Sequence, residues 1–204
     1  MADPASPGDR FDVAAIAASA GGIRALSTLL GGLPTDIAVP VLVVQHLDRR
    51  HETVIAEVLG RRCALPVKLA EDAETTRPGV VYIAPPNRHL LVEPAGVLRL
   101  SDSELVHFVR PSADLLFESV AGTYGNGAIA VVLTGTGADG SMGVRAVDQR
   151  GGTVIVEDPE TAEFSGMPSA AVETGAVDFV LPLDEIAGVV AQLVDRRTDR
   201  DTSA

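Results

Sequence analysis

Three polar residues in the sequence each follow an apolar run of strand length: Ser19, His46 and Asp139. A hydroxyl, an imidazole and a carboxylate are the nucleophile, the general base and the base-orienting group of a hydrolytic triad. Because the carboxyl ends of parallel strands open onto one crevice of an α/β sheet, side chains from three strand ends can meet there. The pattern therefore indicates a candidate site for nucleophilic hydrolysis.

The residues around Ser19 favour a nucleophile. Positions 18–22 read ASAGG, a small-residue turn that leads into a predicted helix starting at Ile23. Small neighbours let a substrate approach, and the unpaired N–H groups at a helix start can stabilise a developing oxyanion. The alternative is that Ser19 only caps the helix while the glycines make a tight turn. Both interpretations fit this segment.

His46 is the best candidate for a general base among the four histidines. It directly follows a predicted buried strand, where a parallel sheet places its active-site groups. His51 starts a predicted helix and is expected to face solvent, whereas His89 and His107 lie in predicted loops near a hairpin. A histidine at a strand end can equally be a hydrogen-bonded surface group, so this alternative stays open for His46.

The turn that carries Asp139 has a second interpretation. Three glycines after a predicted strand and before a predicted helix spell G-x-G-x-x-G: Gly135, Gly137 and Gly140. This spacing is typical of a dinucleotide-binding loop, and Glu157 and Asp158 end the next strand, near where a ribose-binding acid belongs. Inside such a loop, however, Asp139 would repel a pyrophosphate. An NAD(P) site, an orienting Asp139 and a plain helix N-cap stay open as alternatives.

Composition excludes several classes of function. The 204-residue chain has a net charge of −12 and only 3% aromatic residues, which argues against nucleic-acid binding. Its apolar runs are too short to span a membrane, and residues 1–10 lack the features of a secretory signal, so we expect a cytoplasmic protein. With one cysteine, Cys63, and histidines that lack ligand spacing, the sequence predicts neither a disulfide nor a metal site.

The elements that must position these residues alternate between strands and helices. Six mostly apolar runs without a period of two predict buried parallel strands: 13–18, 41–45, 80–84, 128–133, 153–156 and 177–181. Three amphipathic stripes predict helices: 23–30, 54–59 and 186–194. The alternation predicts a doubly wound α/β fold with a mainly parallel sheet and helices on both faces.

Three further features complete the expected organisation. Residues 90–100 predict a β-hairpin inserted in the parallel order, and Pro111 suits the first turn of another helix. We expect residues 1–10 to be disordered, 11–194 to form one catalytic domain and 195–204 to be a flexible tail. The tail is assigned this way because it is polar and has no apolar stripe.

Six segments, in this order along the chain, resemble the catalytic domain of the CheB protein-glutamate methylesterase family: AASAGG at 17–22, VQH at 44–46, YIAPPNRH at 82–89, RPSAD at 110–114, LTGTGADG at 133–140 and GMP at 166–168. The resemblance covers residues 13–186. Six landmarks in order are far more specific than any one of them. The G-x-G-x-x-G then becomes an active-site turn, and the NAD(P)-binding protein becomes the second hypothesis.

The resemblance implies a role for each candidate residue. Ser19 is the nucleophile, His46 the base and Asp139 the orienting acid. Main-chain N–H groups of Ala20 and Thr136 form the oxyanion hole. Many members have methionine where this chain has Thr136, and a main-chain contact tolerates that change. No cofactor is implied.

The resemblance also implies a substrate and a partner. Family members remove methyl groups from γ-glutamyl methyl esters on the cytoplasmic helices of chemoreceptors, and the same acyl-enzyme route serves glutamine deamidation. Three arginines flank Ser19 and His46 in the sequence and predict a basic rim for glutamate-rich helices, with ordinary solvated arginines as the alternative: Arg24, Arg49 and Arg50.

Regulation is the other expectation that the resemblance raises. Typical members carry an N-terminal phospho-acceptor receiver domain, whereas only residues 1–10 precede the segment described above. The expected consequences are a constitutively open enzyme, regulation by a separate protein, or a chain that is one domain of a longer protein.

Overall fold

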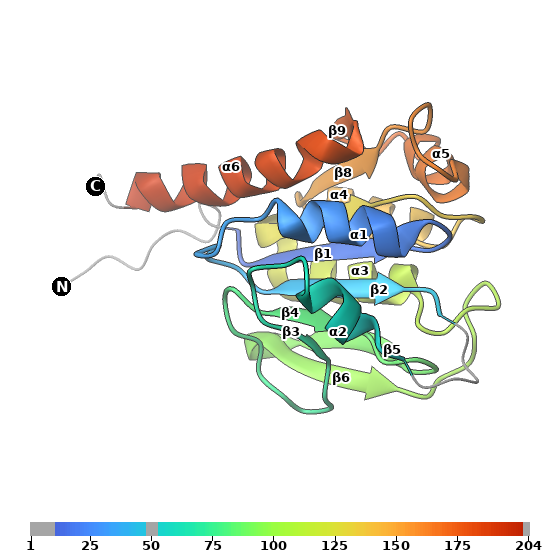
Figure 1. The fold of residues 1–204 in the computed structure, drawn as a ribbon, viewed down its shortest axis with the longest axis horizontal. Helices are drawn as coiled ribbons and strands as arrows, with labels where there is room; N and C mark the ends of the chain where they lie inside the picture. Colours follow the sequence, from blue (N-terminus) through green and yellow to red (C-terminus); the bar gives the residue numbers. More distant parts are fainter. Residues whose placement is uncertain (1–10, 48–52, 202–204) are drawn as a thin grey trace.

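A seven-stranded parallel sheet forms the centre of the computed structural model, which describes residues 11–47 and 53–201, with side chains as far as Asp195 (Figure 1). Its strands are β1 (Val13–Ala18), β2 (Val41–Gln45), β3 (Val67–Leu69), β4 (Val81–Ile83), β7 (Ala128–Val132), β8 (Thr153–Glu157) and β9 (Phe179–Leu181). They lie in the order β3-β4-β2-β1-β7-β8-β9, and every neighbouring pair is parallel. The predicted mainly parallel sheet is confirmed.

β1 lies in the middle of the sheet, and the strand order reverses beside it. From β1 the chain passes to β2 and the β3–β4 edge, and it later returns to β7 on the other side of β1. Every residue of β1, β2 and β7 is buried, which explains why these strands lack an alternating polar pattern. The crevice at the carboxyl ends of these three strands is where an open α/β sheet places its site.

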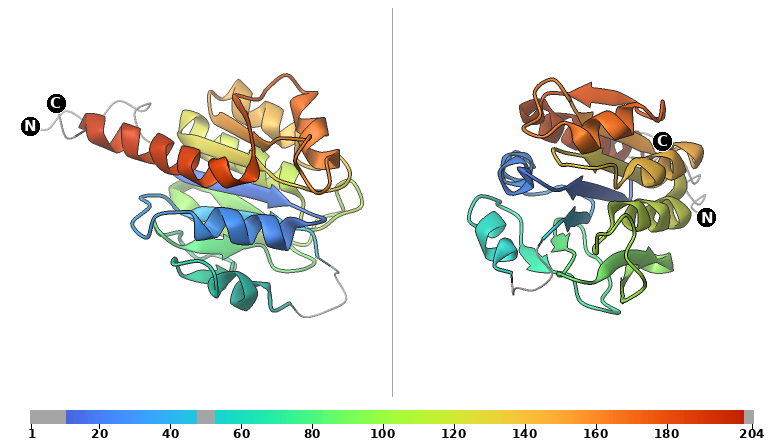
Figure 2. Two further views of the ribbon diagram at one scale, coloured as in Figure 1. Left: turned by 45° about the horizontal axis from the view of Figure 1, so that its top comes forward. Right: turned by 90° about the vertical axis from the view of Figure 1, so that its right-hand side faces the viewer.

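Helices cover both faces of the sheet, as predicted. One face carries α1 (Gly22–Gly31), α2 (Ile55–Gly60) and α6 (Leu183–Asp201). The other carries α3 (Ala113–Tyr124), α4 (Ser141–Gln149) and α5 (Gly166–Val172). Figure 2 shows α1 and α2 on the opposite side of the strands from α3 and α4. The buried apolar side chains accordingly form two cores, one on each face.

The predicted hairpin is a separate two-stranded antiparallel sheet, formed by β5 (His89–Glu93) and β6 (Val97–Ser101) around the turn Pro94–Gly96. It packs against α3, where the Val92 N–H donates to Ser119 Oγ at 3.0 Å. The hairpin therefore extends the second core and holds α3, whose N-terminus faces the crevice described above.

Some predicted strands differ from the observed ones. β3 is missing from the prediction because Lys68 interrupts a run of only three residues. β4 and β9 are shorter than the predicted segments 80–84 and 177–181. Residues 1–10, for which we expect disorder, lie outside the described residues.

Two helix predictions are corrected. Pro111 is not in the first turn of α3, because the helix begins at Ala113 and Ser112 is its N-cap residue. α6 continues to Asp201, so the segment expected to be a flexible tail from residue 195 is helical over its first part. None of the helices in the described part of the chain combines the length and the apolar character needed to cross a membrane.

Candidate active site

Main-chain hydrogen bonds join the ends of β1, β2 and β7. The Ser19 N–H donates to the Thr134 carbonyl at 3.0 Å, and the His46 N–H donates to the Ala18 carbonyl at 3.1 Å. Ser19 and His46 line the same open cavity, which has a volume of about 490 Å³. The structure thus brings the hydroxyl and the imidazole singled out in the sequence to one place.

The imidazole of His46 is held by Asp139. Its Nε2 lies 2.8 Å from Oδ2 of Asp139, and the two side chains are 13% and 4% exposed. Because Nε2 is bonded to the carboxylate, Nδ1 is the ring nitrogen left to accept a proton from a hydroxyl. A histidine held in this way can act as a general base.

The N-terminus of α3 surrounds the Asp139 carboxylate. Asp139 Oδ1 accepts hydrogen bonds from Ser112 Oγ at 2.7 Å and from the Asp114 N–H at 3.2 Å, and Oδ2 accepts one from the Ala113 N–H at 2.6 Å. Burial alone would raise the pKa of Asp139, but these bonds and the bond from His46 hold its pKa below the ordinary value. Asp139 is therefore an ionised, fixed acceptor for His46.

Asp114 makes the reciprocal contact to the next helix. Its Oδ1 accepts hydrogen bonds from the N–H groups of Gly140 at 2.9 Å and Gly143 at 2.8 Å, at the start of α4. Burial, together with the nearby Asp139 charge, raises the pKa of Asp114 against the lowering effect of these amides. The two aspartates thus cap each other's neighbouring helices and tie α3 to α4 beside the site.

The glycine-rich turn offers no free amides at the start of α4 for a dinucleotide. The amides at the start of α4, which would bind a pyrophosphate in that hypothesis, already donate to Asp114. A Cβ on Gly135 would collide with Met167 and lie 2.8 Å from Cβ of Ser19. The glycine at 135 therefore lets this turn pack against the serine, and the geometry does not support the NAD(P) alternative.

Gln45, the last residue of β2, connects the serine and histidine segments. Its Nε2 donates to the Ser19 carbonyl at 2.8 Å and to the His46 carbonyl at 2.9 Å. Gly22 has no side chain at the point where a Cβ would collide with Gln45. The second glycine of the ASAGG turn thus makes room for the amide that holds the two segments in register.

Two main-chain N–H groups are the expected donors of the oxyanion hole. The Ala20 turn carries no side-chain cap for α1, because the N-cap residue is Gly21. Within the described residues, no hydrogen-bond acceptor is found for the N–H groups of Ala20 and Thr136. Thr136 directly follows Gly135, which packs against Ser19. Unpaired main-chain donors of this kind can stabilise an oxyanion.

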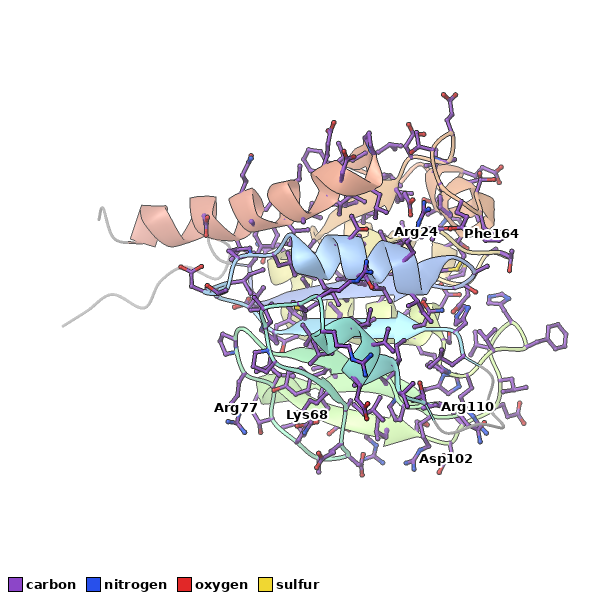
Figure 3. All side chains as sticks on the ribbon, viewed as in Figure 1. Arg24, Lys68, Arg77, Asp102, Arg110 and Phe164 are labelled. Atoms are coloured by element: carbon purple, nitrogen blue, oxygen red, sulfur yellow. The ribbon has the colours of Figure 1, made fainter. Side chains whose placement is uncertain are left out.

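One arginine of the predicted rim can be placed. Arg24 lines the cavity that Ser19 and His46 share, and its side chain is 76% exposed. Its Nε lies 3.7 Å from Oε2 of Glu163, which lines the same cavity. Figure 3 shows Arg24 near Phe164, at the end of the molecule where the strands of the sheet end. The other two predicted rim residues, Arg49 and Arg50, lie outside the described residues.

His89 does not compete with His46. His89 is not in a loop, because it begins β5 and is fully buried. Its Nδ1 accepts from the Ser112 N–H at 3.1 Å, its Nε2 donates to the Glu104 carbonyl at 3.0 Å, and burial lowers its pKa. His89 therefore supports the N-terminus of α3. His51 lies outside the described residues.

Several residues of the site carry no chemical signal of their own in the sequence. They donate hydrogen bonds to the Asp139 carboxylate or to the main-chain carbonyls of Ser19 and His46, or they line the cavity: Gln45, Ser112, Ala113, Asp114 and Glu163. The RPSAD segment was the available signal for three of them, because it marks the start of α3. Among the described residues, no group of three or more potential ligands could hold a metal ion.

Known proteins resemble this chain over most of its length. Residues 14–190 match the family described as CheB methylesterase. A protein-glutamate methylesterase/protein-glutamine glutaminase of Geobacillus kaustophilus is 44% identical over 186 residues, which are 89% of this chain and 53% of the relative. A Leptospira interrogans protein provisionally named for the same two activities is 40% identical over 183 residues, which are 90% of this chain and 95% of the relative. The chain thus spans about half of the first relative and nearly all of the second.

A solved structure extends the comparison to the fold. The crystal structure of the Thermotoga maritima CheB methylesterase catalytic domain matches with a TM-score of 0.87 and 38% identity, over 90% of this chain and 99% of that one. The resemblance drawn from the six sequence segments and the predicted fold class are both confirmed. The chain belongs to the CheB methylesterase family.

Proposed function

We propose that the chain hydrolyses γ-glutamyl methyl esters on the cytoplasmic helices of chemoreceptors, with Ser19 as the nucleophile. One observation carries the assignment: His46 is bonded to Asp139 at 2.8 Å and shares an open cavity with Ser19. Family membership supports the reaction class, and the geometry supports Ser19, His46 and Asp139 as the residues that carry it out. The proposed substrate also places the chain in the cytoplasm.

The first half of the reaction forms an acyl-enzyme. Ser19 Oγ attacks the ester carbonyl while Nδ1 of His46 takes the hydroxyl proton. Asp139 stabilises the imidazolium that results, because its carboxylate stays ionised and bonded to Nε2. His46 then gives the proton to the departing methoxide, and methanol leaves.

The second half of the reaction regenerates the free enzyme. Water, activated by His46, attacks the acyl carbonyl and releases the γ-carboxylate of glutamate together with Ser19. The N–H groups of Ala20 and Thr136 stabilise the oxyanion of each tetrahedral intermediate. A glutamine side chain can enter the same route with ammonia as the leaving group, so we propose deamidation as a second reaction of this site.

The cavity also bears on how the substrate and a regulator approach. Arg24 is exposed at its edge and can attract the acidic residues that accompany methylated glutamates, while Glu163 limits its free charge. Arg49 and Arg50 belong to the same proposed rim. We propose a separate regulatory protein as a partner that controls the activity by covering this open cavity.

Mass spectrometry of a methylated receptor segment tests the proposal. Wild-type protein is expected to convert glutamyl methyl esters to glutamates, and Ser19→Ala to lose about 10⁶-fold in turnover while staying folded. Ser27→Ala is the matched control, because Ser27 lies on α1 and is not among the residues that line the cavity. Equal methanol release by Ser19→Ala and wild type would remove Ser19 from the mechanism.

A further inference from the structure

A tight turn beside the cavity has an unusual conformation. Val106 and Val109 pair across it, with their N–H groups donating to each other's carbonyls at 3.2 and 2.9 Å. The two residues between them, His107 and Phe108, have φ values of 49° and 67°. This left-handed region suits Asn-Gly at the tip of a hairpin and is unfavourable for residues with bulky side chains. The turn is therefore built from two residues that strain it.

Phe108 gains no burial in return for this conformation. Its side chain is 91% exposed, the largest exposure among the large apolar residues of the described chain. A glycine at this position would favour the turn and would remove an apolar group from water. Packing within the molecule therefore does not explain a phenylalanine here, and strain of this kind is found at functional sites.

The turn adjoins the catalytic cavity. Phe108 and Val109 line a small cavity of about 70 Å³ together with His46 and Leu47. His46 and Leu47 also line the larger cavity that contains Ser19. The exposed turn and the proposed base thus belong to one continuous part of the surface.

Hydrogen bonds fix the turn at its base. Nη1 of Arg110 donates to the carbonyls of Asp102 and Ser103, each at 2.7 Å, and Nη2 donates to Asn87 Oδ1 at 2.8 Å. Figure 3 shows Arg110 and Asp102 close together at one end of the molecule. On the other side, Nε2 of His107 lies 3.3 Å from Oδ2 of Asp114. The exposed phenyl ring is thus presented by a braced turn.

We propose that Phe108 is a docking residue for the receptor polypeptide and that it contacts an apolar side chain next to the esterified glutamate. The proposal rests on the function proposed above. The occupant is the substrate itself, because Phe108 lines one small cavity together with His46, the residue that the esterified segment must approach. A second copy of the chain or a membrane seated there would block the base, whereas the segment that carries the ester must pass it.

The test compares two substrates in one set of variants. Phe108→Gly and Phe108→Ala are assayed with a methylated receptor segment and with p-nitrophenyl acetate, a small ester that carries no polypeptide to dock on the turn. The ratio of kcat/KM for the receptor segment to that for the small ester is expected to fall about 10- to 100-fold, through a higher KM for the segment. The thermal midpoint of Phe108→Gly is expected to rise, because glycine accepts the left-handed conformation.

Phe179→Ala is the matched control, because Phe179 is also exposed but lies on β9 and lines neither cavity. Its substrate ratio is expected to stay at the wild-type value. An unchanged ratio for both Phe108 variants would overturn the docking proposal. Faster receptor demethylation, combined with a smaller particle in size-exclusion chromatography, would show that a second copy is the occupant and would also overturn it. Wild-type protein that leaves the receptor segment methylated would instead contradict the proposed function.

Discussion

Asp139 holds His46 through one hydrogen bond, and three other hydrogen bonds to its carboxylate fix the position of that bond. Three donors from the start of α3 fill the remaining acceptor positions of the carboxylate, so it cannot rotate without losing a buried hydrogen bond. Gln45 does the equivalent for the main chain, because it donates to the carbonyls of both Ser19 and His46. The reacting groups are thus held by residues that perform no chemistry themselves.

Removing the Gln45 amide is expected to affect the rate more than binding. Gln45→Leu keeps a side chain of similar size but removes the donor to the His46 carbonyl. The amide then no longer fixes the position of His46 relative to Ser19. We expect kcat to fall by about 100-fold with little change in KM, as displacements of this kind cause. Steady-state kinetics with the receptor segment separates the two constants.

Gln149→Leu is the control, since Gln149 is exposed at the end of α4. A kcat for Gln45→Leu within twofold of wild type would show that the strands alone position the two residues.

Two neighbouring helices are joined through their N-termini. Asp139 precedes α4 and accepts from the start of α3, while Asp114 belongs to α3 and accepts from the start of α4. Each carboxylate satisfies N–H groups that a helix start leaves unpaired and lies near the positive end of that helix dipole. The pairing makes the orientation of α3 against α4 part of the active site.

Loss of the Asp114 carboxylate is expected to destabilise the whole domain. Asp114→Ala leaves the buried amides of Gly140 and Gly143 without an acceptor, which costs about 2 to 4 kcal/mol in the free energy of unfolding. Urea denaturation measures the loss. Asp148→Ala, an exposed substitution on α4, should change the free energy of unfolding by less than about 0.5 kcal/mol.

The loss should also be coupled to the site. Asp139 lies in the same turn as Gly140, so the substitution is expected to disturb Asp139 as well. We expect a lower kcat even at temperatures at which Asp114→Ala is still folded. An Asp114→Ala protein as stable as wild type would contradict the reciprocal capping.

At the scale of the whole molecule, the sheet separates two apolar cores. The site lies at the carboxyl ends of the central strands. The chain has a net charge of −12, and one of its acids, Glu157, is buried at the end of β8. Glu157 Oε2 accepts from the Thr134 N–H at 2.7 Å, next to the turn that follows β7. Burial raises the pKa of Glu157, and the Thr134 amide only partly opposes this. The ionised form is therefore disfavoured in the folded state.

The stability of the molecule should reflect this acid in a pH-dependent way. A carboxyl with a raised pKa in the folded state contributes stability below its ordinary pKa near 4.5 and loses that contribution as the pH rises through the folded value. Glu157→Gln, which can still accept from Thr134, is expected to raise the thermal midpoint at pH 7 and to have no such advantage at pH 4. Thermal unfolding at both pH values measures this.

The exposed Glu160→Gln serves as its control and should show no comparable gain. An equal gain for Glu157→Gln at both pH values, or none at pH 7, would contradict the cost assigned to ionised Glu157.

Much of this architecture is readable from the sequence, for physical reasons that differ between elements. β1 and β2 match their predicted bounds because uninterrupted buried runs show where a parallel strand begins and ends. β3 escapes notice because a three-residue edge strand with Lys68 at its centre has no such signal. The start of α3 is mispredicted at Pro111. Ser112 is the N-cap residue, and its side chain is held by a long-range hydrogen bond to Asp139 that the local sequence does not reveal.

The candidate site is also only partly predictable from the sequence. Ser19 and His46 are predictable because each stands at the end of an apolar run, and Asp139 because its glycine-rich turn follows such a run. Their partners are not visible, because the bonds of Gln45 and Asp114 depend on which strands and helices become neighbours. The family resemblance filled part of this gap by marking the segment 110–114, but it did not show what that segment contacts.

Covalent labelling tests the central claim most directly. A fluorophosphonate reacts with a serine only when a base activates its hydroxyl, and mass spectrometry of the digested protein identifies the residue that carries the adduct. We expect the adduct on Ser19, with labelling slowed strongly by His46→Ala and by Asp139→Asn. An adduct on another serine, or labelling of Ser19 at the wild-type rate in both variants, would contradict the account.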